Sequence, residues 1–175
     1  MPVHRYIWWL PRPRKCKYPG GFPLHFEKKL LSLLRIAPGE VCQPFAGMCE
    51  YGLRIDVRRE VKPDIIADAH HLPVKDNIFQ LTLLDPPYSD DYSKELFGTG
   101  KVHPSQYNKE AVRITKPGGF VVLYHYYLPE RIKDTKWYAI IALITRQYHR
   151  ARIVSIFRKL KLIISLEQFL PGKKE

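Results

Sequence analysis

The apolar run at residues 79–84 (FQLTLL) constrains the fold of this chain more than any other segment. It is nearly continuous rather than alternating, which is typical of a parallel strand whose two faces are both covered. Short apolar runs between turn residues also occur at 40–44, 52–57, 65–67 and 120–124. This pattern predicts an α/β protein with an open, mostly parallel sheet.

Two helices and a hairpin are expected around this sheet. Leucines near helical spacing, with lysines between them, predict an amphipathic helix over residues 24–35. Residues 105–115 predict a second helix. Two β-rich runs at 137–145 and 151–160 flank a polar turn and favour an antiparallel hairpin at one edge of the sheet. A helix for the first of these runs is the alternative, and residues 1–23 are expected to be irregular.

Size and charge set the broad class of the protein. The 175 residues are expected to form a single domain, 1–175, around one core. Lysine and arginine outnumber aspartate and glutamate by 29 to 17, a net charge of +12. This excess favours polyanionic partners, although a basic surface kept for solubility explains the charge alone equally well. No apolar run could span a bilayer and no signal core is apparent, so we expect a cytoplasmic protein that does not bind membranes.

Neither a disulfide framework nor a metal site is expected. The three cysteines, Cys16, Cys42 and Cys49, are scattered and include no Cys-x-x-Cys pair. His70 and His71 are adjacent, and adjacent side chains on an extended chain point to opposite faces. A pair of loop histidines is therefore a better interpretation than a pair of metal ligands.

The segment Asp85-Pro86-Pro87-Tyr88 directly follows the buried run and carries the strongest chemical signal. An exocyclic amino nitrogen on an aromatic ring is a poor nucleophile because its lone pair is delocalised. The Asp85 carboxylate and the Pro86 carbonyl could accept its two hydrogens and free the lone pair for attack on a methyl group. The prolines make the turn rigid, and Tyr88 could stack on an extruded base. A strand-ending turn with a surface aromatic is the alternative.

These four residues resemble the catalytic D-P-P-Y motif of the amino-methyltransferases, a branch of the class I S-adenosylmethionine-dependent methyltransferases. Residues 38–47 (PGEVCQPFAG) resemble the cofactor loop of that family, and residues 18–23 (YPGGFP) resemble the motif that holds the methionine end of the cofactor. The resemblance covers roughly residues 18–125. It implies a Rossmann-like fold, S-adenosylmethionine as the cofactor, and methylation of an exocyclic amino group, with adenine N6 in DNA as the expected target.

The same resemblance assigns individual residues. Asp56 is similar to the acid that binds the ribose hydroxyls, and Asp68 to the acid that binds the adenine amino group; capping of a strand end is the alternative for each. The implied catalytic residues are Asp85, Pro86, Pro87 and Tyr88. The implied cofactor-binding residues are Pro19, Gly20, Gly21, Phe22, Pro23, Phe45, Ala46, Gly47, Asp56, Val57, Asp68, Ala69 and Asp85.

Two departures from the family pattern lie in the cofactor loop. Gln43 stands where the family usually carries an acid, which weakens an expected polar contact near the methionine end. Only eight residues separate Gly47 from Asp56, too few for the helix that normally follows the loop. The fold is therefore expected to be abbreviated after the cofactor loop.

Target recognition is assigned to three basic or aromatic segments, because no stretch is long enough for a separate target-recognition domain. The first two are the N-terminal arm at 1–17 and the loop at 89–104. The third is the C-terminal hairpin and tail, with Arg146, His149, Arg150, Arg152, Arg158, Lys159 and Lys161. Arginine and lysine would bind phosphates and aromatics would stack on bases, although a solvated charged face explains each segment equally well. We expect a short or relaxed sequence preference.

Nucleic acid is the expected partner, with DNA favoured over RNA and a homodimer left open. Guanine-N2 methylation of ribosomal or transfer RNA uses the same turn and is the nearest alternative. A non-catalytic nucleic-acid-binding subunit is the second, motivated by Gln43 and the shortened loop, and methylation of a protein amide is the third. The intact Asp85 argues against the last two.

Overall fold

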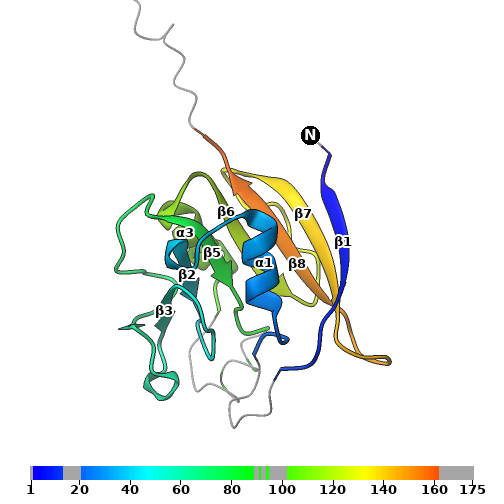
Figure 1. Cartoon of the computed structure of the whole chain (residues 1–175). Coiled ribbons are helices and arrows are strands. Elements are labelled where there is room, and N and C mark those ends of the chain that lie inside the picture. Colours follow the sequence, from blue (N-terminus) through cyan, green and yellow to red (C-terminus); the bar gives the residue numbers. More distant parts are fainter. Residues whose placement is uncertain (1, 14–20, 89–90, 92–93, 95–101, 162–175) are drawn as a thin grey trace, which may run out of the picture.

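The computed structural model describes residues 2–13, 21–88, 91, 94 and 102–161. Over these residues the chain forms one eight-stranded sheet with a helix on each face (Figure 1). The strands are β1 (His4–Trp9), β2 (Val41–Pro44), β3 (Leu53–Asp56), β4 (Ile65–Ile66), β5 (Phe79–Leu84), β6 (Thr115–His125), β7 (Thr135–Ile144) and β8 (Arg152–Lys159). The helices are α1 (Phe26–Leu34) and α3 (Pro104–Ile114), and 3-10 turns lie at Pro38–Glu40 and Arg59–Val61.

The sheet is mostly parallel, with the strand order β1-β7-β8-β6-β5-β2-β3-β4. β8 is antiparallel to both of its neighbours, β6 and β7. The other pairs are parallel. The predicted α/β class, parallel sheet and C-terminal hairpin are therefore confirmed. The helical alternative for 137–145 is wrong, because from Ala139 onward every second side chain of β7 is buried in the sheet.

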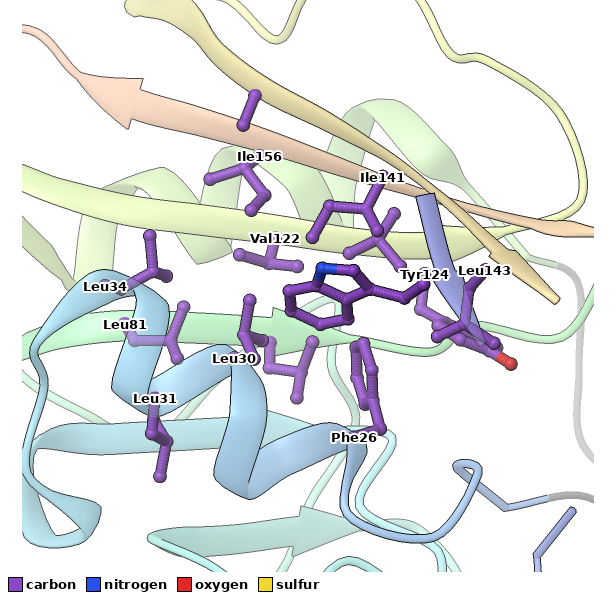
Figure 2. Close-up of a cluster of buried hydrophobic side chains, with 14 of the residues drawn as sticks. Phe26, Leu30, Leu31, Leu34, Leu81, Val122, Tyr124, Ile141, Leu143 and Ile156 are labelled. Atoms are coloured by element: carbon purple, nitrogen blue, oxygen red, sulfur yellow. The ribbon is translucent and has the colours of Figure 1, made fainter. Parts of the chain in front are cut away.

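β5 runs through the middle of the sheet and contributes to the cores on both faces. Leu81 and Leu83 lie in the cluster beneath α1, and Leu84 lies in the cluster beneath α3. Figure 2 shows the first cluster, in which leucines of α1 meet Leu81 and residues of β6, β7 and β8. Coverage of both faces is the reason why this strand is a continuous apolar run.

The two helices begin and end close to the predicted positions. α1 starts two residues later than expected because Pro23–His25 form a turn, with the Phe26 amide donating to the Pro23 carbonyl at 3.1 Å. It ends at Arg35, whose left-handed conformation directs its amide back to the last helical carbonyls. α3 begins at Pro104, a residue suited to the first helical turn. In the described part of the chain, no helix is long and apolar enough to cross a membrane.

β6 is longer than the sequence predicted. The apolar run predicted a strand at 120–124, but the strand extends from Thr115 to His125. Gly119 makes this extension feasible, because a Cβ at this position would lie 2.8 Å from the Gln80 carbonyl of β5. The pairing of β5 with β6 shifts register at this point. The close approach of the two backbones therefore requires glycine.

The prediction that residues 1–23 are irregular is wrong for His4–Trp9, which form β1 at one edge of the sheet. β1 pairs in parallel with β7 over six residues, from His4 opposite Ala139 to Trp9 opposite Ile144. Trp8 is only 6% exposed and packs edge-on against Phe26 of α1, whereas Trp9 is 62% exposed. Because this arm mixes basic and aromatic residues, the alternation of buried and exposed side chains could not be recognised in the sequence.

The half of the sheet that follows β2 is abbreviated, as predicted. β2 connects to β3 through a turn rather than a helix. The Arg54 guanidinium holds this region together by donating to the carbonyls of Gly47, Val61 and Lys62 at 3.1, 2.8 and 3.0 Å. One half-buried side chain thus links the Phe45–Gly47 turn to the connection between β3 and β4.

The adjacent tryptophans of β1 provide a test of its placement. Trp8→Ala should lower the free energy of unfolding by about 3–5 kcal/mol, because it empties a core position beneath α1. Trp9→Ala is the matched control and should lower it by less than about 1 kcal/mol, since most of that side chain faces solvent. Urea unfolding followed by circular dichroism measures both values. Equal losses for the two variants would contradict the strand register.

Candidate functional site

The carboxyl ends of β2, β3, β5 and β6 meet at one edge of the sheet. The residues at or directly after these strand ends are the Phe45–Gly47 turn, Asp56, Asp85 and the His125–Tyr127 segment. In open parallel sheets this edge is the usual place for ligands, because loops there converge from several strands. The sheet therefore gathers most of the predicted site residues that the structure describes.

Asp85 lies immediately after β5 and is surrounded by protein while remaining partly accessible. Burial raises the pKa of its carboxyl group to about 7, and the positive charge of Arg152 opposes that rise. The carboxylate can therefore change protonation state near neutral pH. Such a perturbed acid at a sheet edge is typical of a functional group.

Tyr88 is packed within a group of aromatic rings and one arginine. Its ring lies 5.0 Å from His125 and 5.0 Å from Tyr126, edge-on in both cases. The Arg152 guanidinium carbon lies 5.3 Å from the centre of the Tyr88 ring, a cation–π contact. The Tyr127 ring lies 3.8 Å from His125 on its other side. Tyr88 is thus held by neighbours from β6 and β8.

His125 is the buried member of this group, at 2% exposure. Burial and the charge of Arg152 lower its pKa to about 4, so the imidazole is neutral at physiological pH. Its Nδ1 atom has no hydrogen-bond partner among the described residues. Because the imidazole next to Tyr88 is buried and neutral, Arg152 is the cation of this group that acts on Asp85.

The Phe45–Gly47 turn and Asp56 form a single hydrogen-bonded unit. Phe45 and Gly47 both have positive φ, at 66° and 47°. The Gly47 amide donates to Asp56 Oδ2 at 2.9 Å, and the Arg58 amide donates to Asp56 Oδ1 at 2.9 Å. The Ala46 amide donates to Ile55 at 3.0 Å. Asp56 is buried, so its carboxylate fixes the shape of the turn.

Asp68 is coupled to two histidines. Its Oδ1 accepts from the His70 amide at 2.9 Å and lies 2.6 Å from His70 Nδ1. His70 Nε2 accepts from the His103 amide at 3.0 Å, so Nδ1 must carry the proton and donate it to Asp68. Partial burial raises the pKa of Asp68, but the hydrogen bonds from the amide and the ring of His70 outweigh it and the net shift is downward. His103, the residue before α3, is thereby connected through His70 to the Asp68 loop.

The remaining predicted residues have different surroundings. Pro19 and Gly20 lie outside the described residues, as does most of the 89–104 loop. Phe22 packs on Phe26 and Tyr124 at 4.8 and 5.0 Å. Ala69 is buried in the core beneath α3, whereas Val57 is exposed. Within the described part of the chain, no three His, Cys, Asp or Glu side chains are grouped to hold a metal ion.

Three residues that sequence reasoning missed lie at this site. His125 is the last residue of β6 and Tyr126 directly follows it, and the run of aromatics at this strand end (YHYY) was a usable signal. Glu27, in the first turn of α1, contacts Gln43 of β2, and no local pattern marks it. Arg152 was expected only as a phosphate-binding residue of the hairpin, but it contacts Tyr88.

The comparisons with solved structures identify the fold. The N-methyltransferase NodS of Bradyrhizobium japonicum superposes with a TM-score of 0.53 and 14% identity, over 78% of this chain and 94% of that one. The Escherichia coli protein yhhF, assigned as a methyltransferase, gives a TM-score of 0.51 and 12% identity, over 86% and 91%. This chain has the class I methyltransferase fold. No family model and no curated protein sequence matches it.

The elevated pKa of Asp85 predicts a cost in stability. Between its ordinary value of 3.8 and its folded value of about 7, the folded state binds more protons than the unfolded state. Raising the pH through this window therefore lowers the free energy of unfolding, and the loss is complete above pH 7.

Asp85→Asn should consequently stabilise the protein by about 1–3 kcal/mol at pH 8, with a gain that shrinks towards zero near pH 4. Urea unfolding at a series of pH values measures this difference. Asp134→Asn, at an exposed turn position, is the control and should show no such trend. A gain for Asp85→Asn that is constant with pH would contradict the assigned protonation behaviour.

Proposed function

We propose that this chain is a cytoplasmic enzyme that transfers a methyl group from S-adenosylmethionine to an exocyclic amino group of a nucleic-acid base. Adenine N6 in DNA is the favoured target. The observation that carries the proposal is the position of Asp85 at the carboxyl end of β5, with Tyr88 held beside it among His125, Tyr126 and Arg152. The methyltransferase fold supports it.

Asp85 would act directly on the amine. Its carboxylate would accept one N–H hydrogen and the Pro86 carbonyl the other, which concentrates the lone pair on nitrogen. The amine must lose a proton once it has gained a methyl group, and a carboxylate with a pKa of about 7 can take it. Burial thus gives Asp85 both the acceptor geometry and a basicity suited to neutral pH.

The aromatic group around Tyr88 would hold the base. Tyr126 and Tyr127 are both about 40% exposed and directly follow β6, so they offer ring surface next to the catalytic turn. Stacking on such rings is worth roughly 1–3 kcal/mol per base and offsets part of the energy of extruding the base from a duplex.

Basic residues lie at the same edge of the sheet, at the turn that connects β7 to the antiparallel β8. His149 is exposed, and its pKa is lowered by desolvation and then by the neighbouring charges of Arg146, Arg12 and Arg152. The first target-recognition segment and the hairpin therefore contribute positive charge to one place. This supports binding of a phosphate backbone next to Asp85.

The described residues fit the cofactor. The Phe45–Gly47 turn and Asp56 would hold the adenosine part, and Asp68 would lie beside its adenine ring. Gln43, also at the carboxyl end of β2, has a buried side-chain oxygen without a hydrogen-bond partner among the described residues, which favours a ligand donor there. S-adenosylmethionine supplies an electrophilic methyl group when bound.

The direct test is transfer of labelled methyl from S-adenosylmethionine to unmethylated DNA and, in parallel, to unmodified RNA, followed by nucleoside mass analysis. N6-methyladenine in DNA is the expected product. N2-methylguanine in RNA would keep the roles of Asp85 and Tyr88 and change the substrate. No transfer to either nucleic acid would remove the proposed function.

Substitutions at the catalytic turn should separate chemistry from binding. Asp85→Ala should reduce turnover by at least about 10³-fold, because it removes the acceptor that activates the amine. Cofactor affinity, measured by calorimetry, should change little. Tyr88→Ala should raise KM and lower kcat together, whereas Tyr88→Phe retains the ring and should stay close to wild type. Wild-type turnover in Asp85→Ala would reject the assigned site.

The pH dependence of the rate should report the protonation of Asp85. Wild-type kcat/KM should fall as the pH drops below about 7, because the protonated acid no longer accepts from the amine. Arg152→Gln should move this acid limb to higher pH, since the arginine charge favours the carboxylate. Arg150→Gln, exposed in the adjacent turn, is the control and should leave the limb in place. An unchanged profile in Arg152→Gln would show that this charge does not tune Asp85.

A further inference from the structure

Glu27 is a half-buried carboxylate without a cationic partner. Its Oε1 accepts from Gln43 Nε2 at 2.6 Å, and both of its oxygens lie 3.3 Å from the Glu50 amide. Burial raises its pKa, and the hydrogen bonds from Gln43 and from backbone amides oppose that rise. Among the described residues, no lysine or arginine forms an ion pair with it. All its partners are neutral donors, so its negative charge is uncompensated.

Gln43 presents an acceptor beside this carboxylate. The side chain is 1% exposed, and its Nε2 donates to Glu27 and to the Tyr51 carbonyl at 2.6 and 2.8 Å. Both partners are acceptors, which fixes the orientation of the amide. The Oε1 atom is left buried with no hydrogen-bond partner in the described part of the chain. An orphaned buried acceptor is costly, so a donor is expected at this position.

These two acceptors lie near the other site carboxylates. Gln43 lies in β2, two residues before the Phe45–Gly47 turn. The half-buried Cys49 lies near these carboxylates, since desolvation and then the charges of Glu27, Asp85 and Asp56 raise the pKa of its thiol while Arg54 opposes them. Glu27 therefore belongs to the carboxyl edge of the sheet, although it is carried by a helix.

We propose that Glu27 and the side-chain carbonyl of Gln43 together bind the ammonium group at the methionine end of S-adenosylmethionine. The inference rests on the proposed function for the identity of the cofactor. A primary ammonium has three hydrogens to donate and one positive charge, so it suits a carboxylate paired with a neutral acceptor. β2 carries an amide here rather than an acid, and α1 supplies the charge from outside the cofactor loop.

The test compares two ligands that differ only at the proposed contact region. S-adenosylhomocysteine carries the amino-acid group, and 5′-methylthioadenosine lacks it. Titration calorimetry of the full chain should show that Glu27→Gln weakens S-adenosylhomocysteine binding on the order of 10–100-fold. Binding of 5′-methylthioadenosine should change by less than about threefold.

Two further variants exclude a general effect of charge or folding. Glu50→Gln removes a nearby exposed negative charge without touching the Gln43 amide, and it should leave both affinities close to wild type. Glu27→Gln combined with Gln43→Glu returns the carboxylate to β2 and should recover part of the lost affinity. Thermal unfolding of each variant checks that the fold is retained.

Each outcome either supports or overturns the proposed ammonium site. Loss confined to S-adenosylhomocysteine, with recovery in the double variant, supports the ammonium site. Equal weakening of both ligands by Glu27→Gln, or no weakening of either, overturns it. A wild-type chain that binds neither ligand overturns both this inference and the cofactor of the proposed function. The selective Glu27 effect in a chain that methylates neither DNA nor RNA would keep the ammonium site and reject the proposed function.

Discussion

Burial of β5 on both faces is the constraint on which the site depends. The strand is held between the cores beneath α1 and α3, so its carboxyl end cannot shift relative to the sheet. Asp85 directly follows β5 and lies in the same low-polarity surroundings that stabilise the strand. These surroundings raise its pKa to about 7. The packing that places this acid is therefore also what makes it reactive near neutral pH.

The shortened half of the sheet is stabilised by individual side chains rather than by a helix. Without a helix between β2 and β3, the turn at Gly47 is braced by Arg54 on one side and by the Asp56 carboxylate on the other. Gln43 carries no charge, and Glu27 of α1 supplies one beside it. Arg54 and Glu27 are both long side chains that reach across the sheet edge. This arrangement requires fewer residues than an additional helix.

The sequence predicted the elements whose patterns are local. The continuous run of β5, the leucine spacing of α1 and the length between Gly47 and Asp56 all had direct structural consequences that could be read in advance. It did not predict β1, whose pairing partner β7 lies some 130 residues away, nor the contacts of Glu27 and Arg152, which exist only once distant strands adjoin. Long-range pairing has no signature in a short window of sequence.

The antiparallel hairpin joins the proposed catalytic turn to the basic surface. Because β8 runs against β6, its first residue, Arg152, lies at the edge where β6 ends with His125. A parallel strand would have placed that residue at the opposite edge. Arg152 lies over the Tyr88 ring and favours the ionised form of Asp85, while Arg146 follows from the preceding turn. A phosphate drawn to this turn would lie beside the residues proposed to act on the base, so the reversal of one strand brings the proposed recognition surface next to the proposed site of methyl transfer.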